Sequence, residues 1–120
     1  MKDILVKGLL IFNLVERKSL LVEINNLMFQ NSNLPEEMNW KSACEYCEKL
    51  KFAGFSDWRL PNIEELGLAY NNKDKFKNIE NSSYWSITKS YMSSSRSWVV
   101  SFSDYGDHNQ TSSSDVRCVR

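Results

Sequence analysis

The sequence predicts a single α+β domain, and three observations support this. The first half contains two segments with the period and capping residues of helices, whereas the last third has short β-prone runs between Ser-rich loops. A length of 120 residues fits one folded unit. A hydrophobic content of 42% is too high for a disordered chain, so we expect a soluble globular domain with a real core.

Residues 1–18 are expected to be an N-terminal extension or a first strand. Their apolar run from Leu9 to Phe12 is similar to the core of a secretory signal, but Lys7 and Asn13 interrupt it and no small-residue cleavage site follows. We therefore expect a retained strand or helix here, with a degenerate signal or export leader as the alternative. Residues 19–30 should form a hairpin or two strand pieces, because Asn25-Asn26 is a turn signal between two apolar runs.

The first helix is predicted to begin after Asn39, a good N-cap, and Gly54 follows its end. Its apolar residues recur at i, i+3, i+4, i+7 and i+10, which places on one stripe Trp40, Ala43, Cys44, Cys47 and Leu50.

A second helix is predicted from Ile63 to Tyr70. Asn62 precedes it and Glu65 stands three positions later, the spacing at which cap and carboxylate satisfy each other's exposed amides. Pro61 lies just outside the helix, and Asn71-Asn72 should end it.

Three β segments are predicted after a polar loop, over residues 84–88, 96–102 and 115–120. The second places Trp98, Val100 and Phe102 on one face. Between the last two segments, residues 104–107 (Asp-Tyr-Gly-Asp) should form a turn that opens a longer polar loop. Helices followed by antiparallel strands make an α+β layout.

Composition also bounds the partners. Fifteen basic and fifteen acidic residues give a formal net charge of +0, so we expect no nucleic-acid partner. No apolar run approaches the roughly 20 residues that cross a bilayer, so no transmembrane segment is expected. The chain has four glycines and no glycine-rich phosphate-binding loop, and His108 has no nucleophile or base at a recognised spacing. We expect no cofactor.

Three cysteines allow at most one pair within the chain. Cys44-x-x-Cys47 could be a redox dithiol, but both residues lie inside the predicted helix on its apolar stripe. A zinc site is disfavoured as well, since only His108 could join the three thiols. We instead expect one of the two helix cysteines to bond to Cys118, which leaves one thiol free.

Two further groups have a structural and a functional interpretation. The four tryptophans could be sugar-stacking platforms, but three lie on predicted core stripes or in apolar strands, so core packing is favoured. Trp58 should be structural, and Arg59 should be partly buried and paired with a carboxylate or with carbonyls. Asp104 and Asp107 could contribute to a calcium site, although two carboxylates in a turn are more often only a turn.

The order of motifs resembles the Lcl C-terminal domain family, the module that ends bacterial collagen-like surface adhesins. The resemblance runs from about Leu21 to the last residue, so residues 19–120 are taken as the family domain. The motifs that carry it are Asn39-Trp40, Asp57-Trp58-Arg59-Leu60-Pro61-Asn62, Tyr84-Trp85-Ser86, Trp98-Val99-Val100 and Val116-Arg117-Cys118-Val119-Arg120.

The resemblance implies a C-type-lectin-like fold related to formylglycine-generating enzymes, with two helices packed on a twisted antiparallel sheet and long loops on one side. It also implies a disulfide between Cys47 and Cys118, which leaves Cys44 as the extra thiol. Members are mostly exported, so a secreted, periplasmic or cell-surface location follows, although this chain has no clear signal. The calcium-dependent sugar motifs of lectins and the paired active-site cysteines of the enzymes have no match here.

The expected function is a non-enzymatic binding module or adhesin whose partner is a polysaccharide or another surface protein. We expect its ligand surface on a variable loop from about Lys89 to Ser114. The candidate contacts are Tyr91, Arg96, Asp104, Tyr105, Asp107 and His108: tyrosine for stacking, Arg96 for sulfate or carboxylate, and the aspartates for hydroxyl groups.

A sulfated glycan would require a local basic patch, which Lys73, Lys75 and Lys77 could supply. The alternatives are an enzyme that uses the thiols or a loop-bound metal, and a structural subunit of a surface assembly.

Overall fold

A computed structural model describes residues 20–31, 36–77, 79, 82–90, 94–101 and 105–120, with the backbone alone for residues 105–108. The expected N-terminal extension, Phe102 and the candidate contacts Tyr91 and Asp104 lie outside the described residues.

The described residues fold as two helices and two small antiparallel sheets, which confirms the predicted α+β class. One sheet was expected, but the strands divide into a pair, β1–β2, and a triple in the order β3–β4–β5. The elements are β1 (Leu21–Ile24), β2 (Leu27–Gln30), α2 (Trp40–Lys49), α3 (Ile63–Asn71), a 3-10 turn η1 (Lys73–Lys75), β3 (Ser83–Lys89), β4 (Arg96–Ser101) and β5 (Tyr105–Asn109).

Local sequence signals set most of the boundaries. The predicted hairpin at residues 19–30 is confirmed: Asn25 and Asn26 form its turn with φ of 50° and 67°, a region that Asn tolerates. Asn39 caps α2 by accepting a hydrogen bond from Ser42 N at 2.9 Å. Asn62 and Glu65 form the predicted capping box of α3.

Gly54 has a different role from the one expected. Helix α2 ends at Lys49, and Leu50 is its C-cap. Gly54, with φ of 85°, instead forms a two-residue turn with Ala53, whose φ is 53°. The backbones of Phe52 and Phe55 close this turn with two hydrogen bonds of 2.9 and 3.0 Å.

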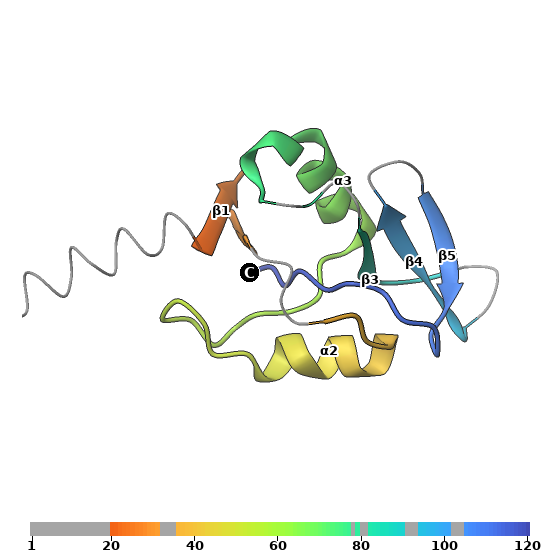
Figure 1. The fold of residues 1–120 in the computed structure, drawn as a ribbon. Coiled ribbons are helices and arrows are strands. Elements are labelled where there is room, and N and C mark those ends of the chain that lie inside the picture. The colour runs from red at the N-terminus through yellow and green to blue at the C-terminus, as the bar shows by residue number, and fades with distance from the viewer. Residues whose placement is uncertain (1–19, 32–35, 78, 80–81, 91–93, 102–104) are drawn as a thin grey trace, which may run out of the picture.

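The two helices cover opposite faces of the three-stranded sheet (Figure 1). Trp85 and Val99 belong to a buried cluster beneath α2, whereas Tyr84 and Val100 belong to a second cluster beneath α3. Successive strand residues point to opposite faces, so neighbouring residues of β3 and β4 supply both clusters. The sheet is therefore the middle layer of the domain.

Residues 116–120, called here the C-terminal segment, pass through the middle of the molecule between α2 and α3 (Figure 1). A strand was expected over residues 115–120, but this stretch makes only isolated bridges: Val119 pairs with Phe29 and with Arg59, and Asp115, just before the segment, pairs with Tyr84. The strand prediction was wrong because each neighbour pairs with it for too short a stretch to form a ladder.

Strand β5 was not predicted. Residues 104–107 were expected to be a turn, but Tyr105 already pairs with Val100, and the ladder continues to Arg96 and Asn109. The segment has no apolar alternation, and its strand character comes from backbone pairing with β4. Much of the variable loop expected between Lys89 and Ser114 is therefore a β-hairpin.

Candidate functional site

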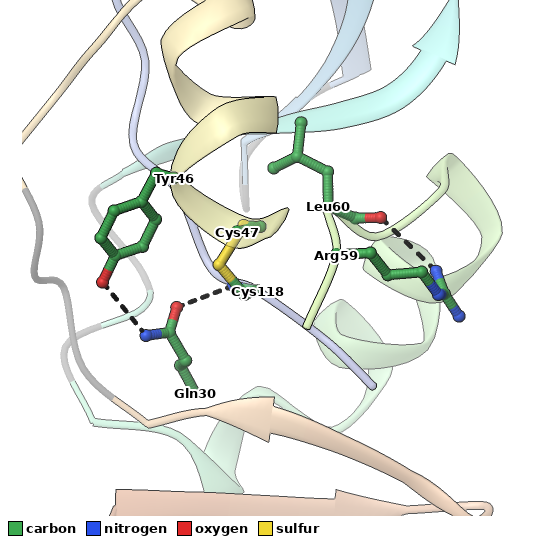
Figure 2. The surroundings of a disulfide bond; sticks show 6 residues. All are labelled: Gln30, Tyr46, Cys47, Arg59, Leu60 and Cys118. Carbon is green, nitrogen blue, oxygen red and sulfur yellow. Dashed lines mark hydrogen bonds between the residues drawn. A yellow bond between two sulfur atoms is a disulfide. The ribbon is translucent and has the colours of Figure 1, made fainter. Parts of the chain in front are cut away.

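Cys47 of α2 and Cys118 of the C-terminal segment form a disulfide, with Cα atoms 5.5 Å apart and no exposed surface on either residue (Figure 2). The implied pairing is confirmed. Gln30 makes two hydrogen bonds to the backbone of Cys118: its Oε1 accepts from Cys118 N at 2.8 Å, and its backbone N donates to Cys118 O at 3.1 Å. The bridge is thus a buried staple, closed to the thiolate attack that redox catalysis needs.

Cys44 is the free cysteine, and it is half-buried on α2. Burial, followed by the nearby charge of Glu48, raises the pKa of its thiol to about 11. The thiol is therefore protonated at neutral pH and is a poor nucleophile. Because Cys47 is already bonded to Cys118, the Cys44-x-x-Cys47 motif is not a dithiol.

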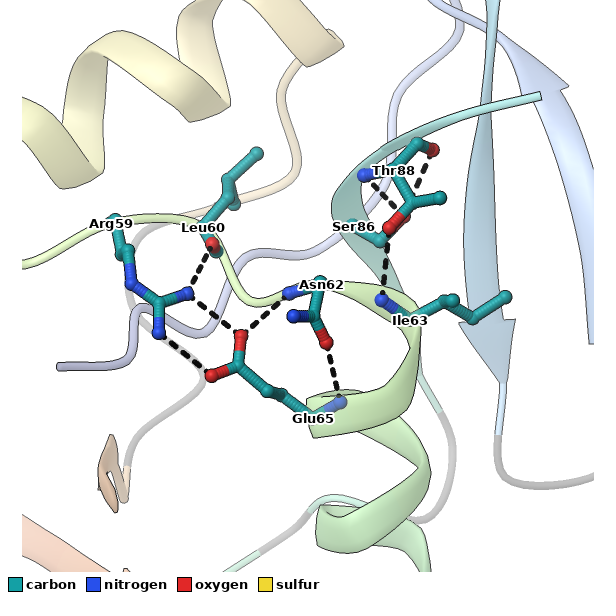
Figure 3. A network of polar contacts seen from close by, with 7 residues as sticks. All are labelled: Arg59, Leu60, Asn62, Ile63, Glu65, Ser86 and Thr88. Atoms are coloured by element: carbon teal, nitrogen blue, oxygen red, sulfur yellow. Dashed lines mark hydrogen bonds and ion pairs between the residues drawn. The ribbon is translucent and has the colours of Figure 1, made fainter. Parts of the chain in front are cut away.

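A polar network joins the Trp-Arg-Leu-Pro segment to the start of α3 (Figure 3). Arg59 donates from both terminal nitrogens to the Glu65 carboxylate at 2.7 Å, as expected of a paired arginine, although its side chain is 48% exposed. Glu65 also accepts from Asn62 N at 2.9 Å. Thr88 of β3 accepts from Ile63 N at 3.1 Å, which ties the helix start to the sheet. The side chains of Arg59, Glu65 and Thr88 therefore have structural roles.

Two of the tryptophans are core residues, as predicted. Trp58 is 3% exposed and donates to Phe52 O at 3.2 Å, and Trp85 is fully buried and donates to Met38 O at 2.8 Å. Trp40 is half-buried, and its indole N–H is held by Ser86 O at 2.9 Å. The fourth, Trp98, is half-buried on β4.

The β4–β5 hairpin holds all four of the predicted contacts that the structure describes. Arg96 and Trp98 are two residues apart on β4 and therefore share a face of the sheet. Val100, two residues further on, lies on the same face and is fully buried. The register places Asp107 opposite Trp98 and Tyr105 opposite Val100. The position of His108, opposite Ser97, belongs to the other face.

The base of this hairpin is fixed to helix α2. Gln110, which follows β5, donates through its side-chain amide to Ser97 Oγ at 3.0 Å and to Ser94 O at 3.2 Å. Its carbonyl accepts from Trp40 N at 3.0 Å. These hydrogen bonds therefore hold the base of the hairpin in a fixed position relative to the start of α2.

The three lysines considered as a basic patch lie away from this hairpin. They follow the end of α3, on the β1 side of the molecule (Figure 1). Lys77 N donates to Asn31 Oδ1 at 2.7 Å, which places it next to the end of β2. Lys73 is half-buried with its ammonium 5.3 Å from the centre of the Tyr70 ring. These lysines do not supply a basic patch at the hairpin.

The sequence interpretation missed an open groove of about 490 Å³ beside α2. It is lined by Met38, Ser42, Glu45, Tyr46, Lys49, Leu50 and Lys51. Tyr46, which lies off the predicted stripe and four residues before Leu50, was the available signal for further apolar surface beside this helix.

Within the described residues, no group of three or more His, Cys, Asp or Glu side chains is arranged to hold a metal ion. In the same part of the chain, no helix has the length and apolar character needed to span a bilayer.

Together these features define a small α+β domain with a buried disulfide and a polar hairpin fixed at one end. The profile of the Lcl C-terminal domain matches residues 23–120, and the chain belongs to that family. No curated protein matches this sequence.

Proposed function

We propose that this domain is a non-enzymatic binding module of an exported bacterial protein, with a glycan as its ligand. A C-type-lectin-like fold is part of this proposal. Three features support that fold: a disulfide from a helix to the C-terminal segment, backbone pairing of β2 with the last residues, and helices packed on an antiparallel sheet. The disulfide is compatible with export, because such bonds persist in oxidising compartments.

The observation that carries the proposal is the outer part of the β4 face. Val100 is fully buried, whereas Arg96 and Trp98 on the same face are only half-buried. An aromatic ring beside a guanidinium can stack on the apolar face of a sugar and bind a carboxylate or sulfate on it. Asp107 pairs with Trp98 in the β4–β5 register, and we propose that it contacts a hydroxyl group of the same sugar.

The two helix cysteines give little support to the alternative of a thiol-dependent enzyme. Cys47 is committed to the buried bridge, and the raised pKa of Cys44 leaves little thiolate at neutral pH. Alkylation of Cys44 separates these functions: unchanged glycan binding is expected of the binding module, and loss of a turnover activity would favour the enzyme.

A glycan array with the full chain, followed by titration calorimetry on the glycans it retains, tests the proposal. We expect Arg96→Gln to weaken binding of acidic glycans about tenfold or more, as for loss of a charge-assisted hydrogen bond. Trp98→Leu should weaken acidic and neutral glycans alike. Lys75→Gln, at an exposed position on η1, is the matched control and should have no effect.

Two outcomes would contradict the proposal. If the array retains nothing while a protein of the same envelope binds, the domain is a structural subunit. If glycans bind but Arg96→Gln and Trp98→Leu leave their affinities unchanged, the ligand surface lies elsewhere.

A further inference from the structure

Two segments of the chain have the pattern Asn-x-Ser/Thr in which the middle residue is not proline. They are Asn81-Ser82-Ser83 and Asn109-Gln110-Thr111. This pattern is the acceptor sequence for N-linked glycosylation, which takes place at accessible surface segments of exported proteins. Asn81 lies outside the described residues, so the structure bears on the second segment alone.

The second segment lies on the surface at an edge of the sheet. Asn109 is the last residue of β5, which is an outer strand in the order β3–β4–β5. Asn109 and Thr111 are both exposed, as are Ser112 and Ser113 after them. Ser112 N donates to Asn109 O at 2.9 Å and closes a turn. The acceptor asparagine therefore ends a strand and begins an exposed turn.

The two residues that the pattern requires contact each other. Thr111 donates to Asn109 Oδ1 twice, from its backbone N at 3.0 Å and from its Oγ1 at 2.8 Å. Both bonds use the amide oxygen, and neither uses Nδ2, the atom to which a sugar is attached. The middle residue, Gln110, instead reaches into the domain and donates to the Oγ of buried Ser97 at 3.0 Å. The side chains of Asn109 and Thr111 are thus presented together at the surface.

We propose that Asn109 is an acceptor site for N-linked glycosylation. The donor class is an oligosaccharide carried on a polyprenyl pyrophosphate. Asn109 Nδ2 forms a bond to the anomeric carbon of the first sugar, and the bond from that carbon to the pyrophosphate oxygen breaks. The polyprenyl pyrophosphate leaves, and Nδ2 loses one proton.

This inference rests on the export that is part of the proposed function, and it does not depend on the proposed ligand. The β4–β5 register pairs Asn109 with Arg96, so an attached oligosaccharide would adjoin the proposed ligand face. Acceptance of the oligosaccharide is therefore measured by mass and not by ligand binding.

Transfer in vitro tests the site. The full oxidised chain is incubated with a bacterial oligosaccharyltransferase and an oligosaccharide on polyprenyl pyrophosphate, and intact-mass analysis and peptide mapping follow. We expect the mass to rise by one oligosaccharide, located on the peptide that contains Asn109. Asn81→Gln is the matched control and should leave this addition unchanged.

Two variants should lose the addition for different reasons. Asn109→Asp keeps a side-chain oxygen that can accept from Thr111, so the turn is retained, and it removes only the amide nitrogen. Thr111→Ala removes the hydroxyl that the pattern requires, whereas Thr111→Ser should retain the addition.

A peptide of residues 105–113 in the same reaction separates recognition of the sequence from access in the folded domain. If the peptide is modified and the folded chain is not, the hairpin hides Asn109. If neither is modified, the segment is not an acceptor, and an addition that persists in Asn109→Asp lies elsewhere. Each of these results overturns the proposal. Modification at Asn109 together with an empty glycan array would support this inference and contradict the proposed ligand.

Discussion

Glu65 is a single residue that satisfies two different needs. One carboxylate oxygen accepts from Asn62 N and from Arg59, and the other accepts from the second terminal nitrogen of Arg59 (Figure 3). The hydrogen bonds from Arg59, with that from Asn62 N, hold the pKa of the Glu65 carboxyl below its usual value. A lowered acid pKa stabilises the fold above the pKa of the unfolded chain, and this stabilisation is lost as the pH falls through the folded value.

We therefore expect Glu65→Gln to lower the free energy of unfolding by about 1 kcal/mol near neutral pH. The difference from the parent should shrink in acid, below the usual glutamate range, because the parent carboxyl is then protonated too. Urea titrations over a pH series measure this. Glu64→Gln, an exposed neighbour in the same helical turn, is the control. Parallel pH profiles for the parent and Glu65→Gln would contradict the account.

Arg117 shows why some residues cannot be interpreted from the sequence alone. Nothing local distinguishes it from Arg120, which lies two residues from the buried Cys118 but is half-buried, forms an ion pair with Asp57 and covers the Phe55 ring at 3.7 Å. Arg117 is fully buried because the C-terminal segment alternates between the two core clusters, and its neighbours there come from distant parts of the chain.

At the level of elements, starts and turns with a local chemical signature were predictable. The Asn25-Asn26 turn and the Asn39 and Asn62 caps each depend on a side chain within three residues of the backbone it serves. Strand β5 was not predictable, because its partner is β4 and its own composition is polar. The same limit applied to the candidate site, because the register of β5 against β4 decides that Asp107 lies opposite Trp98.

The turn at Ala53 and Gly54 leads to a prediction at this scale. Both residues have positive φ, and an Ala with its Cβ is disfavoured there by roughly 1 kcal/mol, whereas Asn tolerates this region. We expect Ala53→Asn to raise the free energy of unfolding by about 0.5–1 kcal/mol, measured by chemical denaturation. Gly54→Ala should have the opposite effect of similar size. An Ala53→Asn variant no more stable than the parent would show that the turn adopts another conformation in solution.

At the scale of the whole molecule, the sequence predicted the components and the resemblance predicted the bridge, but not the arrangement. The C-terminal segment was expected to be a strand of a single sheet. It instead contributes Val116 and Cys118 to the cluster beneath α2 and Val119 to the cluster beneath α3. That role depends on contacts across most of the chain, which neither period nor propensity encodes.

The disulfide should be the largest single contribution to the stability of this arrangement. It spans 71 residues, and on the chain-entropy model a loop of that size stabilises the fold by about 4 kcal/mol. We expect the paired change Cys47→Ala with Cys118→Ala to lower the free energy of unfolding by about that amount, whereas Cys44→Ser should change it by less than about 0.5 kcal/mol. Guanidinium titrations of the three proteins measure both differences. A loss near 1 kcal/mol for the paired change would mean that the packing and hydrogen bonds of the C-terminal segment hold the two cores together without the covalent bond.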